Sequence, residues 1–271
     1  MTETAYRSVD GLAIEVHDAV LWLRLDRPAF RNAIDDTMMA GLIDAVDASG
    51  RDEDIRAIHI TGSGDHFCGG ADIVARNAGG HRRPRVGAIQ RRLPAQAHRL
   101  VPLLCSVQVP VVCAVRGWAA GIGLQIAVAA DFTVAAEDAR FWEPFSARGF
   151  TPDSGATWLL PRAVGMARAR ELLLLGRELS GTEAAAWGLV HRAVAPPEVD
   201  RHSRELVSSL ASGPTVSLGL TKWLMHAGAS LPLENHLHNE AFAMELSSRS
   251  EDFREGLGAF KERRSPDFKG R

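Results

Sequence analysis

Hydrophobic and polar residues alternate in two short segments near the start of the chain, residues 12–16 and 20–25. This period of two, on either side of His17-Asp18, predicts a β-hairpin. Asp35-Asp36 then precedes apolar residues at helical spacing, which predicts a capped helix to about Ser49 with a core face of Met38, Met39, Leu42, Ile43 and Val46. A further apolar strand predicted at residues 55–61 completes the order strand, strand, helix, strand, which is typical of an α/β fold.

The most apolar window of the chain, residues 109–130, begins with a β-branched run that predicts a buried strand at 111–115. Gly121 and Gly123 follow, and an apolar segment of helical character comes next. A glycine turn that leads into a helix leaves backbone N–H groups free, and these suit an oxyanion or a phosphate. The same pattern also occurs in turns that serve only close packing.

A second small-residue turn, Gly69-Gly70-Ala71-Asp72, follows the strand predicted at residues 55–61. Two such turns, each placed after a strand, are able to direct two N–H groups at one point. Two donors form an oxyanion hole, which is often the largest single contribution to transition-state stabilisation. The second turn therefore favours a catalytic interpretation of the first.

The remaining pattern predicts a long helical second half. Short strands are expected at 132–135 and 189–194, and helices at 93–106 (bent at Pro94 and Pro102), 154–160, 166–175, 180–187, 199–211, 215–227, 233–248 and 251–262. Pro196-Pro197 divides the chain into a core of residues 1–195 and a helical region of residues 196–271. The later helices carry more apolar surface than they can bury alone, so we expect this region to mediate oligomerisation.

Composition narrows the classes of function. The 271 residues carry a formal net charge of −2, which argues against nucleic acid as a partner, because phosphate binding needs a basic face. The three cysteines form no CxxC pair, which is typical of a reducing compartment and predicts no metal site. No signal peptide is evident, and Arg116 interrupts the apolar window, so we expect a cytoplasmic protein without a membrane span.

The arginine-rich segment 75–92 predicts a surface loop that enters a helix. One alternative is a lid whose arginines meet a phosphorylated ligand. Another is RNA binding by the cluster from Arg82 to Arg92, which the net charge of the whole chain weakens.

Four segments, LDRPAFRNAI, FCGGADI, VRGWAAGIGLQIAVAAD and GFTPDSGATWLLPRAVG, resemble in order and spacing the motifs of the crotonase (enoyl-CoA hydratase/isomerase) superfamily. The resemblance covers about residues 12–271. Within the superfamily, PDSGATWLLPR and the C-terminal REGLGAFKERRSPDFKGR are most similar to ring-1,2-epoxyphenylacetyl-CoA isomerase-like members.

The resemblance implies a crotonase-like spiral of ββα units with a C-terminal helical trimerisation region, assembled as a homotrimer or a dimer of trimers. It implies an acyl-CoA thioester substrate, with coenzyme A as part of that substrate and no separate cofactor. The oxyanion donors would be the N–H groups of Ala71 and Ile122. The coenzyme A would be bordered by Arg27, Ala29, Ala71, Asp72 and Ile73, and by Phe260 and Arg263 of a neighbouring subunit.

The sequence departs from the hydratases of this superfamily at both of their glutamates, where it has Gln125 and Phe145. Syn-hydration needs one group to activate water and another to supply the α-proton, and neither side chain can do so. Asp153 remains, at the position of the catalytic aspartate of dienoyl-CoA and ring isomerases. Isomerisation through a dienolate needs only one such carboxylate, although Asp153 is equally explained as a helix N-cap.

Other candidates stay open. Glu143 is a second carboxylate of structural or catalytic use. Gln125 is expected in the substrate pocket, and Phe145, Trp118 and Trp142 are expected either in that pocket or in plain core. His98, together with Asp153, resembles the aryl-CoA dehalogenase branch, but a lone helical histidine is more often a surface residue.

The sequence therefore predicts an acyl-CoA isomerase that shifts a double bond or opens a ring epoxide through a thioester (di)enolate. The alternatives are an enoyl-CoA hydratase of fatty-acid or aromatic-acid breakdown, an aryl-CoA dehalogenase, and a non-catalytic acyl-CoA-binding protein.

Overall fold

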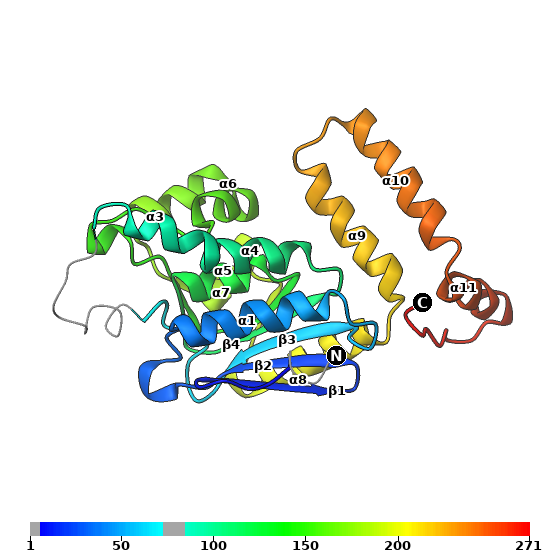
Figure 1. The fold of residues 1–271 in the computed structure, drawn as a ribbon, viewed down its shortest axis with the longest axis horizontal. Coiled ribbons are helices and arrows are strands. Elements are labelled where there is room, and N and C mark those ends of the chain that lie inside the picture. The colour runs from blue at the N-terminus through cyan, green and yellow to red at the C-terminus, as the bar shows by residue number, and fades with distance from the viewer. Residues whose placement is uncertain (1–5, 73–84) are drawn as a thin grey trace.

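The computed structural model describes residues 6–72 and 85–271 (Figure 1). Ile73 and residues 75–84 of the arginine-rich segment lie outside the described residues.

A six-stranded sheet forms the centre of the molecule, in the order β1-β2-β3-β4-β6-β9. The predicted hairpin is confirmed, because β1 pairs with β2 in antiparallel register, while the other neighbours are parallel. β4 is buried along its whole length, as its apolar run predicts. The strands are β1 (Leu12–His17), β2 (Val20–Leu25), β3 (Ala57–Gly62), β4 (Val111–Val115), β6 (Phe132–Ala136) and β9 (Arg192–Val194).

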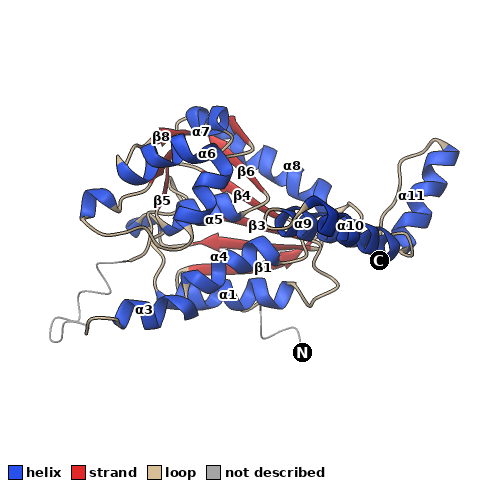
Figure 2. Ribbon diagram, turned by 90° about the horizontal axis from the view of Figure 1, so that it is seen from above, coloured by secondary structure: helices blue, strands red, loops and turns tan. Residues whose placement is uncertain are grey.

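Helices cover both faces of this sheet (Figure 2). On one face lie α1 (Asp36–Ser49) and α4 (Ala97–Ser106), and the methionines predicted for the core, Met38 and Met39, are buried there. On the other face lies α8 (Val199–Ala211), whose Val207 and Ala211 pack on Val20, Ala57 and Val112. α8 thus packs on the sheet, although it falls after the boundary predicted at residue 195.

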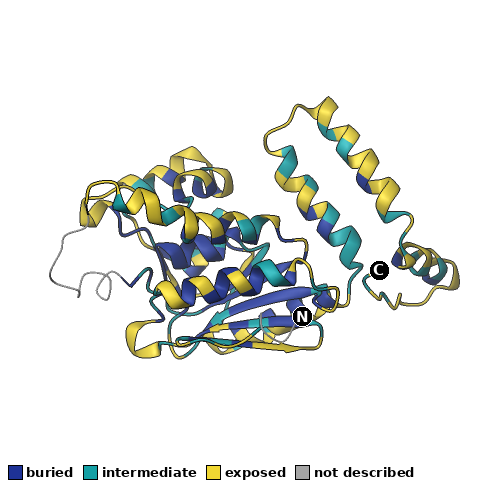
Figure 3. Ribbon diagram, viewed as in Figure 1, coloured by how far each residue is buried: buried dark blue, intermediate teal, exposed yellow. Residues whose placement is uncertain are grey.

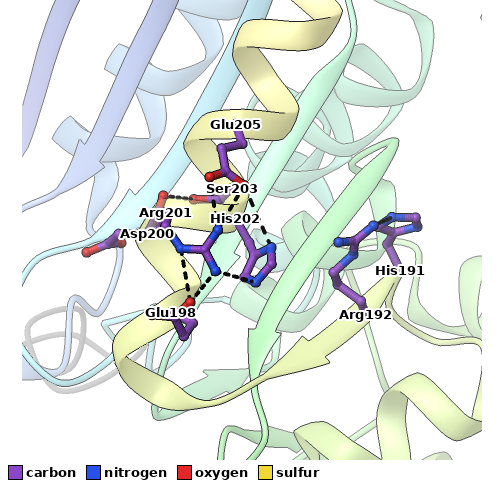
Figure 4. A network of polar contacts seen from close by, with 8 residues as sticks. All are labelled: His191, Arg192, Glu198, Asp200, Arg201, His202, Ser203 and Glu205. Atoms are coloured by element: carbon purple, nitrogen blue, oxygen red, sulfur yellow. Dashed lines mark hydrogen bonds and ion pairs between the residues drawn. The ribbon is translucent and has the colours of Figure 1, made fainter.

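α8 begins in a network of charged side chains (Figure 4). Arg201 reaches Glu198 and, at 2.9 Å, Glu205. Asp200 pairs with Arg116, the residue that follows β4. All of these side chains except Arg116 are well exposed, so the network contributes little to stability.

A smaller sheet of β5 (Trp118–Ala120), β7 (Arg140–Trp142) and β8 (Leu179–Ser180) lies beside the main one. The sequence did not indicate β5, because three residues are too few to show a period. The predicted direct passage from β4 through the glycines to α5 (Ile122–Ala129) is therefore wrong: the chain first forms β5.

The helices that follow agree with their predicted positions. α6 (Ala156–Leu174) is broken at Gly165, where φ is +78°, so it corresponds to the two helices predicted there. α7 (Gly181–Trp187) begins with a capping box between Ser180 and Glu183. The helix predicted at 93–106 starts late, because residues 93–95 form a 3-10 turn and Gln96 is non-helical; a short helix, α3 (Ala88–Arg92), precedes it.

The last three helices, α9 (Thr215–Gly228), α10 (Leu233–Ser247) and α11 (Glu251–Glu262), extend away from the sheet and are largely exposed (Figures 1 and 3). Lys222 anchors α9 to the core: its Nζ lies 2.7 Å from Asp131 Oδ2 and donates to Leu104 O at 2.8 Å. No helix in the described part of the chain is long and apolar enough to cross a membrane.

Candidate active site

A cavity of about 630 Å³ opens between the two glycine turns, α3 and the loop that precedes α6. Its walls are mainly apolar. Its lining includes Met39, Gly69, Gly70, Ala71, Val86, Ile89, Leu93, Ala97, Gly121, Ile122, Pro144, Phe145, Phe150, Asp153 and Ser154, with Arg85, Arg92, Arg148 and Gln96. The described part of the arginine-rich segment thus forms one wall of the cavity.

The two glycine turns meet because backbone hydrogen bonds join them. Cys68 N donates to Trp118 O at 2.8 Å, and Ala120 N donates to Cys68 O at 2.9 Å. The approach leaves no room for a side chain at Gly123, where an added Cβ would lie 2.6 Å from Cys68 Cβ. Burial raises the pKa of the Cys68 thiol to about 12, so Cys68 serves packing at this seam and is no nucleophile.

Ala71 and Ile122 come from the two turns, and both line the cavity. Within residues 6–72 and 85–271, neither backbone N–H donates a hydrogen bond to a carbonyl of the chain. Ile122 is also the first residue of α5, where the helix dipole favours negative charge. The structure therefore brings the two predicted donors to one cavity.

Asp153 lines the same cavity and does not cap a helix. α6 begins at Ala156 with Gly155 at its N-cap, at φ +86°, so the N-cap explanation of Asp153 is wrong. Instead, Asp153 Oδ1 accepts a hydrogen bond from Ser154 Oγ at 2.7 Å. Ser154 holds φ of +55°, which is costly for a residue with a Cβ, so the turn that presents Asp153 is strained.

Gln125 and Glu143 do not line the cavity, although the sequence placed Gln125 in the pocket. Both side chains are fully buried behind its wall, and Gln125 Nε2 donates to Glu143 Oε1. Burial raises the pKa of Glu143 to about 8; the hydrogen bond from Gln125 opposes this shift, and the charge of Asp153 adds to it.

Of the aromatic residues expected in the pocket, Phe145 lines the cavity. Trp118 and Trp142 do not line it. Their rings pack on one another at 5.9 Å between centroids, and the two residues lie on the paired strands β5 and β7. Trp142 Nε1 also donates to Gly176 O at 3.0 Å. These two rings therefore support the wall.

His98 is exposed on α4 and is not among the residues that line the cavity. The structure thus does not bring His98 and Asp153 together as a dehalogenase would require.

The residues predicted to border coenzyme A fall into two places. Arg27 pairs with Asp72 at 3.0 Å and with Asp35 at 3.4 Å, so it joins the segments that lead to α1 and to Ala71. Ala29 is exposed beside it on a 3-10 turn. Phe260, 81% exposed, and Arg263 lie at the end of α11, at the opposite end of the molecule from α3 and α6 (Figure 1).

Two residues that support the site gave no clear signal in the sequence. Asn32 is fully buried with φ of +55°, and its amide donates to Ser63 O and His66 O, which fixes the loop after β3. For Ser154, the sequence indicates only the start of a helix. Among the residues described, no cluster of His, Cys, Asp or Glu is arranged to hold a metal ion.

Residues 15–271 match the family model described as enoyl-CoA hydratase/isomerase. The chain is 38% identical to the 1,2-epoxyphenylacetyl-CoA isomerase of Escherichia coli (strain K12), over 94% of this chain and 97% of that protein. It is 30% identical to the crotonyl-CoA hydratase of Syntrophomonas wolfei, over 96% and 98% of the two chains.

Among solved structures, an enoyl-CoA hydratase/isomerase from Cupriavidus metallidurans CH34 superposes with a TM-score of 0.88 at 30% identity, covering 98% of each chain. An enoyl-CoA hydratase from Polaromonas sp. JS666 gives a TM-score of 0.88 at 29% identity, over 95% of this chain and 99% of that one. The predicted crotonase-like α/β fold is confirmed.

Proposed function

The chain belongs to the enoyl-CoA hydratase/isomerase family, and we propose that within it the protein is an acyl-CoA isomerase. The observation that carries this proposal is the lining of the cavity: Asp153 shares it with the Ala71 and Ile122 N–H groups. Among the described lining residues, Asp153 is the only carboxylate. One acid–base group and one oxyanion hole are what a proton shift next to a thioester requires.

In the proposed reaction the thioester oxygen accepts hydrogen bonds from Ala71 N–H and Ile122 N–H. The Asp153 carboxylate takes a proton from a carbon of the acyl chain, and the electron pair of that C–H bond moves through the conjugated system to the thioester oxygen. The same carboxyl group returns the proton to a different carbon as the thioester carbonyl re-forms. The double bond shifts, and neither water nor a cofactor is consumed.

Enoyl-CoA hydration is the second candidate, because relatives at 30% identity carry hydratase names. Hydration needs a second proton-transfer group in contact with substrate. Gln125 and Glu143 lie behind the cavity wall and Phe145 has no acidic proton, so the lining supports isomerisation better. The dehalogenase alternative loses support from the exposed position of His98.

Asp153→Asn tests the proposal. Asparagine keeps the size of the side chain but cannot take and return a proton, so kcat for 3-enoyl-CoA or ring-epoxide CoA esters should fall on the order of 10²–10⁴-fold. The Kd for CoA esters and the Tm should stay close to the wild-type values. Asp10→Asn, at an exposed aspartate that does not line the cavity, is the matched control.

Isomerase turnover that survives in Asp153→Asn would remove Asp153 from the mechanism. A wild-type protein that hydrates crotonyl-CoA and isomerises nothing would favour the hydratase instead.

A further inference from the structure

The residues behind the cavity wall contain a buried acid that the proposed mechanism does not use. Glu143 follows the last residue of β7 and is 0% exposed, and within the described residues no lysine, arginine or histidine forms an ion pair with it. Its contact is the amide of Gln125 on α5. An ionised carboxylate buried without a cation is strongly disfavoured.

Two oxygen atoms of this pair lack partners. Gln125 Oε1 and Glu143 Oε2 are both buried and accept no hydrogen bond among the residues described. A proton on Glu143 Oε2 satisfies both atoms at once: the acid O–H donates to Gln125 Oε1 while Gln125 Nε2 donates to Glu143 Oε1. When Glu143 is ionised, its charged Oε2 and the Gln125 Oε1 are both buried without a donor. This destabilises the ionised form relative to the protonated one.

The pair also restrains the second oxyanion turn. Gly121 O accepts from the backbone N of Gln125 at 3.1 Å and from its Nε2 at 3.2 Å. Gly121 C=O and Ile122 N–H belong to one planar peptide and point in opposite directions. The bonds that Gln125 makes to Gly121 O therefore set the direction of the Ile122 N–H.

The restraint is tied to β7 as well. Gly121 N donates to Trp142 O at 3.0 Å, one residue before Glu143. Gly121 itself has φ of +51° and ψ of −123°, a conformation open to glycine and poorly fixed by the residue alone. External hydrogen bonds are what hold this peptide in place.

We propose that Glu143 carries a proton at neutral pH and forms a two-point acid–amide pair with Gln125, and that this pair aims the Ile122 N–H into the cavity. Glu143 and Gln125 are positioning residues that do not touch the substrate. A neutral Glu143 also keeps a second negative charge away from the thioester oxygen as the enolate forms. The aiming half of the proposal rests on the oxyanion role of Ile122 in the proposed function, whereas the protonation half does not.

The electrostatic surroundings agree with a neutral acid. Asp153, in the turn before α6, is the charged group among the described residues that raises the pKa of Glu143, and α5 contributes only the Gln125 amide, which lowers it. The pKa of Glu143 rises from 4.5 to about 8, mainly through burial. Because the folded-state pKa is raised, the stabilisation is complete below pH 4.5 and is lost as pH rises to about 8.

The first experiment measures the free energy of unfolding against pH for the wild type and Glu143→Gln. The wild type should lose stability relative to the variant as pH rises from 4.5 to about 8, because glutamine has no proton to lose. Parallel stability curves for the two proteins would overturn the protonated pair, whatever the enzyme does.

The second experiment tests the aiming of Ile122. Butyryl-CoA, a saturated ester with no double bond to shift, is bound and its thioester carbonyl stretch is recorded by infrared difference spectroscopy. Glu143→Ala should show a smaller downward shift of that stretch than Glu143→Gln, because glutamine still pairs with Gln125 at two points. In turnover assays, Glu143→Ala should have a kcat on the order of tenfold below that of Glu143→Gln, with similar KM.

The outcomes separate the two proposals. A carbonyl shift that depends on residue 143 in a protein without isomerase activity would support the pair and contradict the proposed function. Equal carbonyl shifts and equal kcat in Glu143→Ala and Glu143→Gln would overturn the positioning role. Should Glu143→Ala fail to fold, Gln125→Leu removes the same restraint on Gly121 O and takes its place.

Discussion

The elements behind the cavity and the C-terminal helices differ in how much of their apolar surface is buried. At the cavity end, packing covers β4, β5 and α5, and the cavity in front of them holds a pair of N–H groups and one carboxylate among its described lining residues. At the C-terminal end, the Lys222 anchor is buried, and the exposed side chains include the large apolar residues Trp223, Met225, Leu233, Phe242, Met244 and Phe260. The elements behind the cavity are thus covered within one chain, whereas the C-terminal helices leave large apolar side chains exposed.

The contrast extends to two acids, Asp131 and Glu143. Asp131, near the start of β6, is matched by a cation, Lys222, and also accepts from Val111 N at 2.8 Å. Glu143, among the residues that the structure describes, pairs with the amide of Gln125 and with no cation. A largely buried acid paired with a cation fixes α9 to the core, whereas a fully buried acid without one is driven toward its neutral form.

Removal of the Lys222 charge is expected to have the largest effect on stability. Lys222→Met keeps the length of the side chain but leaves Asp131 largely buried and without its cation, which should cost about 3–5 kcal/mol in the free energy of unfolding. The midpoint of urea denaturation measures this loss. Lys222→Met combined with Asp131→Asn should recover part of it, and a single variant as stable as the wild type would show that the pair does not anchor α9.

Self-association should cover the exposed apolar face of the C-terminal helices. Light scattering at micromolar concentration should return a multiple of three of the 29.3 kDa chain mass. The reason is that a patch of this extent on a monomer favours an interface. A mass of one chain would mean that the apolar face stays exposed in solution, and it would contradict the predicted trimer.

Arg263 is expected to serve a neighbouring subunit, because it lies at the far end of the molecule from its own cavity. Arg263→Ala should weaken binding of CoA esters by about 1.5–3 kcal/mol, the value of a charge-assisted hydrogen bond to phosphate. Isothermal titration with a CoA ester measures this, and Lys261→Ala on the same helix is the matched control. An unchanged Kd would remove Arg263 from the site.

Assemblies that mix two variants test directly whether Arg263 of one subunit completes the site of another. Subunits that carry Arg263→Ala retain Asp153, and subunits that carry Asp153→Asn retain Arg263. Refolded together, they should form some complete sites across the subunit boundary and regain activity that neither variant has at low substrate. No gain on mixing would mean that Arg263 does not complete a neighbour's site.

The parts of the structure that the sequence predicted are those with local signals. The strand at 111–115, the glycine turns and the helix at 180–187 are encoded by adjacent residues, and all are found. The burial of Glu143 and the partner of Lys222 depend on contacts between segments far apart in the chain, which no local pattern reports. Asp153 was expected as a candidate base, but the strained Ser154 that presents it was not, because a serine seldom adopts positive φ.

Substitutions of Ser154 should have the smallest effect of those predicted. They separate the contribution of backbone strain from that of the hydrogen bond to Asp153. Ser154→Ala removes the hydroxyl that donates to Asp153 Oδ1 but keeps the positive φ, so kcat should fall about fivefold, the equivalent of ~1 kcal/mol for one hydrogen bond. Ser154→Gly removes the same hydroxyl and also the strain of a Cβ at φ +55°, so its unfolding free energy should exceed that of Ser154→Ala by about 1 kcal/mol. Denaturation curves and kcat for the two variants provide the comparison. Equal kcat in the wild type and both variants would show that the serine hydroxyl does not position the Asp153 carboxylate, and equal stability of the two variants would show that the turn stores no strain.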